Sequence, residues 1–184
     1  MQYRVINKQD VSEQLLPMED ITFFVRALDP EHEQTLEILR YAAIDACERM
    51  TNRLIGINTV QLSIDTYRPR IQLPLGDVHT IESITARDSN GEVITLAATE
   101  YRLNTISGEL FISSNKSRLK DFVITYQVGY SVESVPHVLK IGILKLIAHW
   151  FDVGREDVIV GVSVSDIPFN HRACFDLYRL PNLV

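Results

Sequence analysis

Residues 135–156 read VPHVLKIGILKLIAHWFDVGRE, and this stretch constrains the fold more than any other part of the chain. At helical spacing its apolar positions cover almost the whole circumference, and a narrow polar seam remains at Lys145, His149 and Asp152. A helix with so little polar surface is buried among other elements. The sequence therefore predicts a helical core with this helix at its centre.

Two segments before residue 57 also have helical signals. Residues 16–28, LPMEDITFFVRAL, predict a first helix, because Glu19 and Asp20 suit the positive end of the helix dipole. A second helix is predicted to begin at Asp29, a favourable N-cap, and to end at Gly56. Its apolar residues recur every three or four positions and form one core-facing stripe. The stripe consists of Leu36, Leu39, Ala43, Cys47, Met50 and Leu54, and Glu37, Asp45 and Glu48 lie on other faces.

Between residues 57 and 130 the apolar pattern changes to the alternation that is typical of β-strands. Asn90-Gly91 predicts a hairpin with a type I′ turn, in which both central residues have positive φ. Short strands at this spacing form an antiparallel sheet or a small sandwich. A further short strand is possible at Tyr3–Ile6. The strand segments are TVQLSID, RIQLPL, VHTIESITARD, VITL, YRLN, GELFIS and FVITYQV.

The segments follow one another as helices, then strands, then helices. A last short helix is predicted over residues 170–177, and Pro181 prevents it from continuing. Because the β block is continuous and its flanking helices need each other's apolar faces, we expect an α+β fold, a small helical bundle with an inserted antiparallel sheet or sandwich. The helical domain then consists of residues 1–56 and 131–184, and the inserted β domain of residues 57–130.

Composition and charge exclude several classes of protein. With 46% hydrophobic and 23% charged residues the chain is of ordinary globular composition. A formal net charge of −6 without a Lys/Arg cluster argues against a free-standing nucleic-acid-binding protein. No apolar run reaches the roughly 18–20 residues of a membrane span, and the N-terminus does not read as a signal peptide, so we expect the protein to stay in the cytoplasm of its host. Cys47 and Cys174 are expected to be reduced core thiols.

The titratable residues form no recognisable catalytic or metal-binding pattern. The five histidines lack the short spacings of metal ligands. His149 and Asp152 could form an oriented acid–base pair on one helix, but no nucleophile motif or glycine-rich phosphate loop accompanies them. We therefore expect no catalytic residue, metal or cofactor, and keep an enzyme that uses these two residues as an alternative.

A second alternative is a ligand-binding β module on a helical base. Aromatic side chains of the β block could line a platform for a sugar or a peptide, although tyrosines in strands more often close the edge of a core. The residues in question are Tyr67, Tyr101, Phe111, Tyr126 and Tyr130.

Three apolar features favour assembly with other proteins. The helix over residues 135–151 has more apolar surface than one amphipathic neighbour covers. Residues 153–168 form a long valine-rich stretch with no helical stripe, and long loops of this kind are usually functional. The C-terminal residues from Tyr178 onward are also apolar. These features predict contacts with partner subunits.

The order of segments resembles one known family over nearly the whole chain. Residues 37–55 contain ILRYAAIDACERMTNRLI, which is similar to a helix of that family ending in the pattern of Met50-Thr51-Asn52-Arg53. Further similar segments are IQLPLGDVHTIESI, DSNGEVITLAATEYRL, VITYQVGY, VPHVLKIGILKLIAHWFDVGREDVIVGVSVSDIPF and the closing LYRLP. The chain thereby resembles the head-to-tail connector, or adaptor, proteins of long-tailed double-stranded DNA phages and gene transfer agents, in the version that carries a β insertion.

The resemblance implies a structural protein of the virion neck with no catalytic activity. Such proteins form a ring, usually of twelve copies, beneath the portal protein, and connect the DNA-filled head to the next neck (stopper) or tail protein. Double-stranded DNA passes through the lumen of the ring without sequence-specific binding. A different neck or tail-completion ring protein is an alternative within the same class.

The resemblance also implies which residues make these contacts. The C-terminal segment reaches into the portal, and the helical domain forms the ring. The portal-binding residues would be Tyr178, Arg179, Leu180, Pro181, Asn182, Leu183 and Val184. The residues at the subunit interface would be Ile143, Ile147, Trp150, Phe151, Arg155, Val158, Val160 and Val162.

Overall fold

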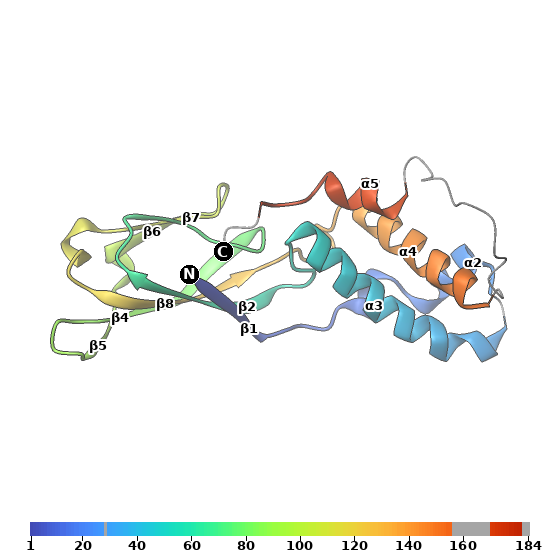
Figure 1. Cartoon of the computed structure of the whole chain (residues 1–184), viewed down its shortest axis with the longest axis horizontal. Coiled ribbons are helices and arrows are strands. Elements are labelled where there is room, and N and C mark those ends of the chain that lie inside the picture. Colours follow the sequence, from blue (N-terminus) through green and yellow to red (C-terminus); the bar gives the residue numbers. More distant parts are fainter. Residues whose placement is uncertain (28, 156–169, 182–184) are drawn as a thin grey trace. The chain divides into compact units, whose positions relative to one another are not determined.

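A computed structural model describes residues 1–27, 29–155 and 170–181 of the 184-residue chain. The fold is mixed α+β, as predicted, and the chain divides into two compact units (Figure 1). The β unit consists of Met1–Gln9, Gly56–Ser131 and Leu180–Val184. The helical unit consists of Asp10–Ile55 and Val132–Arg179.

The β unit contains two antiparallel sheets. The larger has the order β1-β2-β8-β4-β5, and the smaller has the order β3-β7-β6. The strands of the larger sheet are β1 (Gln2–Asn7), β2 (Asn58–Thr66), β4 (Val78–Arg87), β5 (Val93–Thr95) and β8 (Lys120–Val128). Those of the smaller sheet are β3 (Arg70–Gln72), β6 (Tyr101–Asn104) and β7 (Glu109–Ile112), and short 3-10 turns cover Ala98–Glu100 and Ser114–Lys116.

The alternation seen in the sequence produces the buried face of the larger sheet. In β2 every second residue is buried, including Val60 and Leu62, and in β8 the same holds for Ile124 and Tyr126. The buried hydroxyl of Tyr126 donates a hydrogen bond of 3.2 Å to the Pro74 carbonyl, which satisfies its polar end. The strand segments predicted from the period-two pattern are therefore confirmed.

The N-terminal strand belongs to the β unit. β1 pairs antiparallel with β2, with Val5 opposite Val60 and Tyr3 opposite Leu62. The sequence predicts a helical domain of residues 1–56 and 131–184, whereas Met1–Gln9, Gly56, Ser131 and Leu180–Val184 belong to the β unit. This segment belongs to the β unit because β1 pairs with a strand that is distant in the sequence. No local sequence pattern indicates such pairing.

The hairpin between β4 and β5 differs from the predicted type I′ turn. Gly91 has a φ of +84°, whereas Asn90 is not among the residues with positive φ. The Asp88 carboxylate accepts hydrogen bonds from the backbone N–H groups of Asn90, at 2.8 Å, and Glu92, at 2.9 Å. The loop therefore uses one left-handed residue, and the side chain of Asp88 satisfies the exposed donors.

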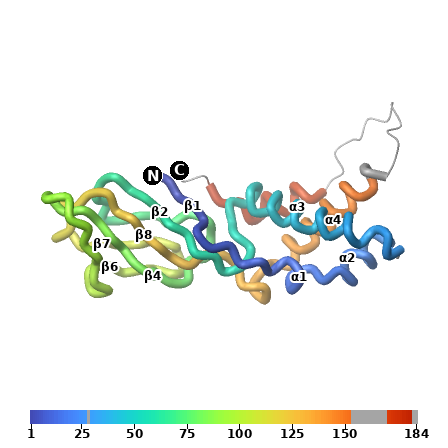
Figure 2. Tube along the Cα trace, turned by 90° about the horizontal axis from the view of Figure 1, so that it is seen from below, coloured from blue at the N-terminus to red at the C-terminus, as the bar shows by residue number. Residues whose placement is uncertain are grey.

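The helical unit consists of α1 (Ser12–Leu15), α2 (Met18–Val25), α3 (Glu33–Thr51), α4 (His137–Arg155) and α5 (His171–Asp176). These helices lie side by side in both views (Figures 1 and 2). α4 packs against α2, α3 and α5, so three neighbours of the same unit cover its wide apolar surface. Its exposed residues among those whose burial is described are His137, Val138, Ile141, His149 and Asp152, and they lie along one side of the helix.

The second predicted helix begins later and ends earlier than expected. The Asp29 side chain caps a 3-10 turn over Pro30–His32, and α3 starts only at Glu33. α3 ends at Thr51, where Asn52 with a φ of 53° forms a left-handed C-cap. Gly56, predicted to end this helix, lies beyond it with a φ of +86°.

Glu48, which lies off the predicted core stripe of α3, is buried at 9% exposure. Its carboxylate accepts a hydrogen bond of 2.8 Å from the backbone N–H of Ile55. A buried carboxylate is tolerated where it satisfies a backbone donor, and here it closes the chain reversal that follows α3.

α4 and α5 approach each other closely at Gly142. A Cβ atom at this position would lie 2.6 Å from Cε1 of Phe175 and 2.9 Å from Cβ of Cys174. Phe175 is fully buried and Cys174 nearly so. The glycine is therefore required by the space between the two helices and not by its backbone conformation.

The same pair of helices brings two histidine rings together. The rings of His149 and His171 are stacked at a centroid distance of 6.4 Å, and His171 also contacts the edge of Phe175 at 6.0 Å. Partial burial, and then the charges of His149 and Arg172, lower the pKa of His171 below its ordinary value of 6.5.

We expect Gly142→Ala to lower the free energy of unfolding of the helical unit by about 1–3 kcal/mol, because the new methyl group overpacks the contact with Phe175. Urea unfolding followed by circular dichroism measures this loss. The double variant Gly142→Ala, Phe175→Leu should be less destabilised than the sum of its two single variants, since the leucine removes the ring edge that the methyl group meets. Strict additivity would contradict the close approach.

We expect the stability of the protein to fall as the pH drops from 7.5 through 6.5, in part because of His171. Its lowered pKa means that the unfolded chain takes up this proton first, so stability is present above 6.5 and is lost as the pH falls through the folded pKa. His171→Gln should reduce the difference between the urea midpoints at pH 7.5 and 5.5. The exposed His137→Gln serves as control, and an equal reduction in both variants would contradict the assignment.

Candidate assembly site

The predicted subunit-interface residues of α4 lie mostly in the interior of the helical unit. Ile143 and Ile147 are fully buried, Phe151 is 3% exposed, and Trp150 is half-buried. Arg155 ends α4, but its side chain, like Val158, Val160 and Val162, lies outside the described residues. The three buried side chains fill the core between α4 and its neighbours, so of the described members only Trp150 offers surface to another subunit.

Large apolar side chains of the helical unit other than the predicted interface residues are exposed. Phe23 on α2 is 81% exposed, Ile38 on α3 is 64% exposed, and Leu177 after α5 is 74% exposed. Tyr41 and Ile141 are less exposed, at 42% for each. Exposed apolar side chains mark a contact surface where they form one contiguous patch, and these residues are the candidates for such a patch in the helical unit. The sequence reasoning did not select them, although Ile38 and Tyr41 lie off the core stripe of α3.

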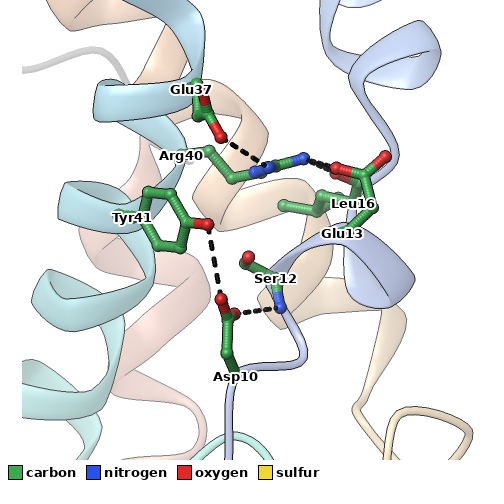
Figure 3. Close-up of polar contacts among 7 residues, drawn as sticks. All are labelled: Asp10, Ser12, Glu13, Leu16, Glu37, Arg40 and Tyr41. Carbon is green, nitrogen blue, oxygen red and sulfur yellow. Dashed lines mark hydrogen bonds and ion pairs between the residues drawn. The ribbon is translucent and has the colours of Figure 1, made fainter.

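A buried arginine holds α1 against α3 (Figure 3). The guanidinium of Arg40, 3% exposed, donates to the Glu13 carboxylate and, at 3.3 Å, to the Leu16 carbonyl, and Glu37 lies 3.8 Å away. Its Nε atom has no hydrogen-bond partner within the described residues. Arg40 was not selected from the sequence, and its partners give it a structural role in docking α1.

Asp10 forms a second link at the start of the helical unit (Figure 3). Its carboxylate accepts a hydrogen bond of 3.0 Å from the backbone N–H of Ser12 and one of 3.3 Å from the hydroxyl of Tyr41. The hydrogen bonds from Ser12, and more weakly that from Tyr41, lower the pKa of Asp10. Both links fix the residues with which the helical unit begins.

The predicted portal-binding segment is divided between the two units. Tyr178 and Arg179 belong to the helical unit, and Leu180 and Pro181 belong to the β unit. Arg179 is exposed and lies 4.0 Å from Asp176. The last three members, Asn182, Leu183 and Val184, lie outside the described residues.

The structure gives little support to the acid–base pair of His149 and Asp152. Both side chains are exposed, and the ring of His149 stacks on that of His171. Among the described residues no three His, Cys, Asp or Glu side chains are grouped so that they could hold a metal ion. Burial raises the pKa of the Cys47 thiol to about 12, which makes it a poor nucleophile, and both cysteines are free and buried.

Of the five aromatic residues considered for a ligand platform, Tyr126 and Tyr130 are buried, and Tyr67, Tyr101 and Phe111 are half-buried. Tyr126 is fully buried and Tyr130 is 7% exposed. The guanidinium groups of Arg70 and Arg102 lie over the ring of Phe111 at 5.3 and 4.9 Å, so cation–π contacts occupy it.

Among the described helices none is long and apolar enough to cross a membrane.

Comparison with solved structures shows where else this fold occurs. A chain in the neck of an empty gene transfer agent particle, solved with C6 symmetry, has a TM-score of 0.73 to this chain at 20% identity. A chain in the virion of a native gene transfer agent particle has a TM-score of 0.74, and one in the neck of a native particle with C12 symmetry has a TM-score of 0.68, each at 20% identity. Each match covers 100% of this chain and 98% of the other.

No family model matches the sequence, and no curated protein is significantly similar to it. The structural matches extend over both the helical and the β unit. The chain therefore has the fold of these neck and virion chains along its whole length.

Proposed function

We propose that this chain is a structural head–tail adaptor of a phage or gene transfer agent virion. It forms a ring under the portal protein and connects the DNA-filled head to the next neck or tail protein. The observation that carries the proposal is the match over 100% of the chain, with TM-scores of 0.68 to 0.74, to chains of gene transfer agent necks and virions. The resemblance of the sequence motifs to those of adaptor proteins also supports the proposal.

The exposed apolar side chains of the helical unit suit contacts between copies in a ring. A ring needs two different faces on each subunit, because its contacts are heterologous. Ile38 and Tyr41 on α3 offer one apolar surface, and Val138 and Ile141 on α4 offer another. The C12 symmetry of one similar neck structure agrees with the twelve copies of the proposed ring.

The charge distribution suits a conduit for DNA that does not bind it. Asp10–Ile55 contains ten Asp or Glu residues and four Arg residues, so much of the negative charge of the chain lies in this segment. An acidic surface repels the phosphate backbone, whereas a basic lining would bind it at every register. The proposed partners are the portal protein and a downstream neck or tail protein.

Ring formation is tested with Ile38→Asp, which places a charge on the exposed face of α3. We expect the full chain, mixed with its portal protein, to form ring complexes that mass photometry detects, and the variant to remain monomeric because a buried carboxylate destabilises the contact. Ile106→Asp is the matched control, since Ile106 is 98% exposed in a loop of the β unit. Rings that form equally well with both variants would show that this face of α3 lies outside the subunit contact.

Portal binding is tested by removing residues 180–184. This truncation keeps α5 and the two hydrogen bonds that close its last turn, from the Tyr178 N–H to Phe175 and from the Arg179 N–H to Asp176. We expect the shortened chain to fold and to lose its binding to portal-containing, DNA-filled heads, measured by co-sedimentation. Heads that bind this variant as tightly as the full chain would overturn the role of the C-terminal segment.

A further inference from the structure

The four residues Met50-Thr51-Asn52-Arg53 end α3 and turn the chain so that one side chain reaches the C-terminal segment. The Thr51 hydroxyl donates a hydrogen bond of 2.7 Å to the Cys47 carbonyl, and Asn52 adopts the left-handed conformation that ends the helix. The next residue, Arg53, donates from Nε to the backbone carbonyl of Tyr178 at 2.8 Å. This contact joins residues that are 125 positions apart, within the helical unit.

The position of Arg53 is itself fixed on both sides. Before it, the turn at Asn52 sets the direction of the chain, and after it Leu54 and Ile55 are buried at 7% and 2% exposure. The backbone N–H of Ile55 is held by Glu48. Arg53 therefore projects from a part of the chain that is held on both sides, and its hydrogen bond links this part to Tyr178.

Both peptide groups of Tyr178 are held. Its N–H donates to the Phe175 carbonyl at 3.0 Å, and its carbonyl accepts from Arg53. Phe175 in turn is fully buried against Gly142 of α4. The chain beyond Tyr178 thus leaves the helical unit from a residue that is anchored to both α3 and α5.

We infer that Arg53 is a positioning residue for partner binding by the C-terminal segment. The inference rests on the proposed function, in which residues from Tyr178 onward bind the portal. By holding the carbonyl of Tyr178, Arg53 fixes the residue at which the C-terminal segment begins. A segment that starts from a fixed residue loses less conformational entropy on binding, so the hydrogen bond raises affinity without touching the partner.

Two substitutions, whose side chains extend as far from Cα as Nε of arginine, separate the effect of this hydrogen bond from that of the other contacts of Arg53. In glutamine the amide nitrogen is as many bonds from Cα as Nε is in arginine, so Arg53→Gln keeps a donor for the Tyr178 carbonyl. In Arg53→Met a methyl group takes that place, and the donor is lost. Both variants lack the charge and the terminal nitrogens of the guanidinium, so any other contact of Arg53 is lost equally in the two.

The experiment titrates full-length chain, Arg53→Gln and Arg53→Met against portal-containing heads and compares apparent Kd values from co-sedimentation. We expect Arg53→Met to bind about tenfold more weakly than Arg53→Gln, which corresponds to one hydrogen bond of ordinary strength. Ring formation, measured by mass photometry, should be the same in both variants. Equal binding by the two variants would overturn the inference.

The truncated chain without residues 180–184 distinguishes this inference from the proposed function. If the truncation abolishes head binding while both Arg53 variants bind equally, the segment binds the portal but Arg53 does not position it. If the truncation leaves head binding intact, the role of the segment itself is wrong.

Discussion

The close approach of α5 to α4 at Gly142 is the constraint on which the C-terminal part of the helical unit depends. A methyl group at this position would lie 2.6 Å from the ring of Phe175, so only glycine lets the buried phenylalanine seat here. Phe175 then accepts the Tyr178 N–H, and Tyr178 accepts from Arg53. The absence of a side chain at Gly142 thereby lets α5 pack closely against α4. This packing helps to hold Tyr178, where the segment that is proposed to bind the portal begins.

Periodicity predicted most elements of the fold, because it reports which face of a segment is buried. The alternation in β2 and β8 and the apolar circumference of α4 both became buried faces. It did not report pairing between distant segments, so β1 was assigned to the wrong part of the chain. Local signals also failed where a side chain took over a backbone role, as Asp88 did in the hairpin and Glu48 after α3.

The candidate assembly site was harder to predict from the sequence. An apolar periodicity indicates that one face of a helix is buried, but it does not indicate whether the same chain or a partner subunit buries that face. Ile143, Ile147 and Phe151 were assigned to a subunit interface on their hydrophobicity, yet helices of their own unit bury them. The apolar residues left for a partner, Phe23 and Ile38, are next to other apolar residues, Phe24 and Leu39, so hydrophobicity in the sequence does not single them out. Only the packed structure separates the two groups.

The motif Met50-Thr51-Asn52-Arg53 contains no catalytic group, and its proposed role is to position the C-terminal segment. Thr51 and Asn52 end a helix, and such roles are open to many residues, but Arg53 is placed by them at the one carbonyl that precedes the C-terminal segment. A lysine has no donor at the place of Nε, and a shorter side chain does not reach it. The geometry therefore requires a donor at the place of Nε, which arginine and glutamine both supply.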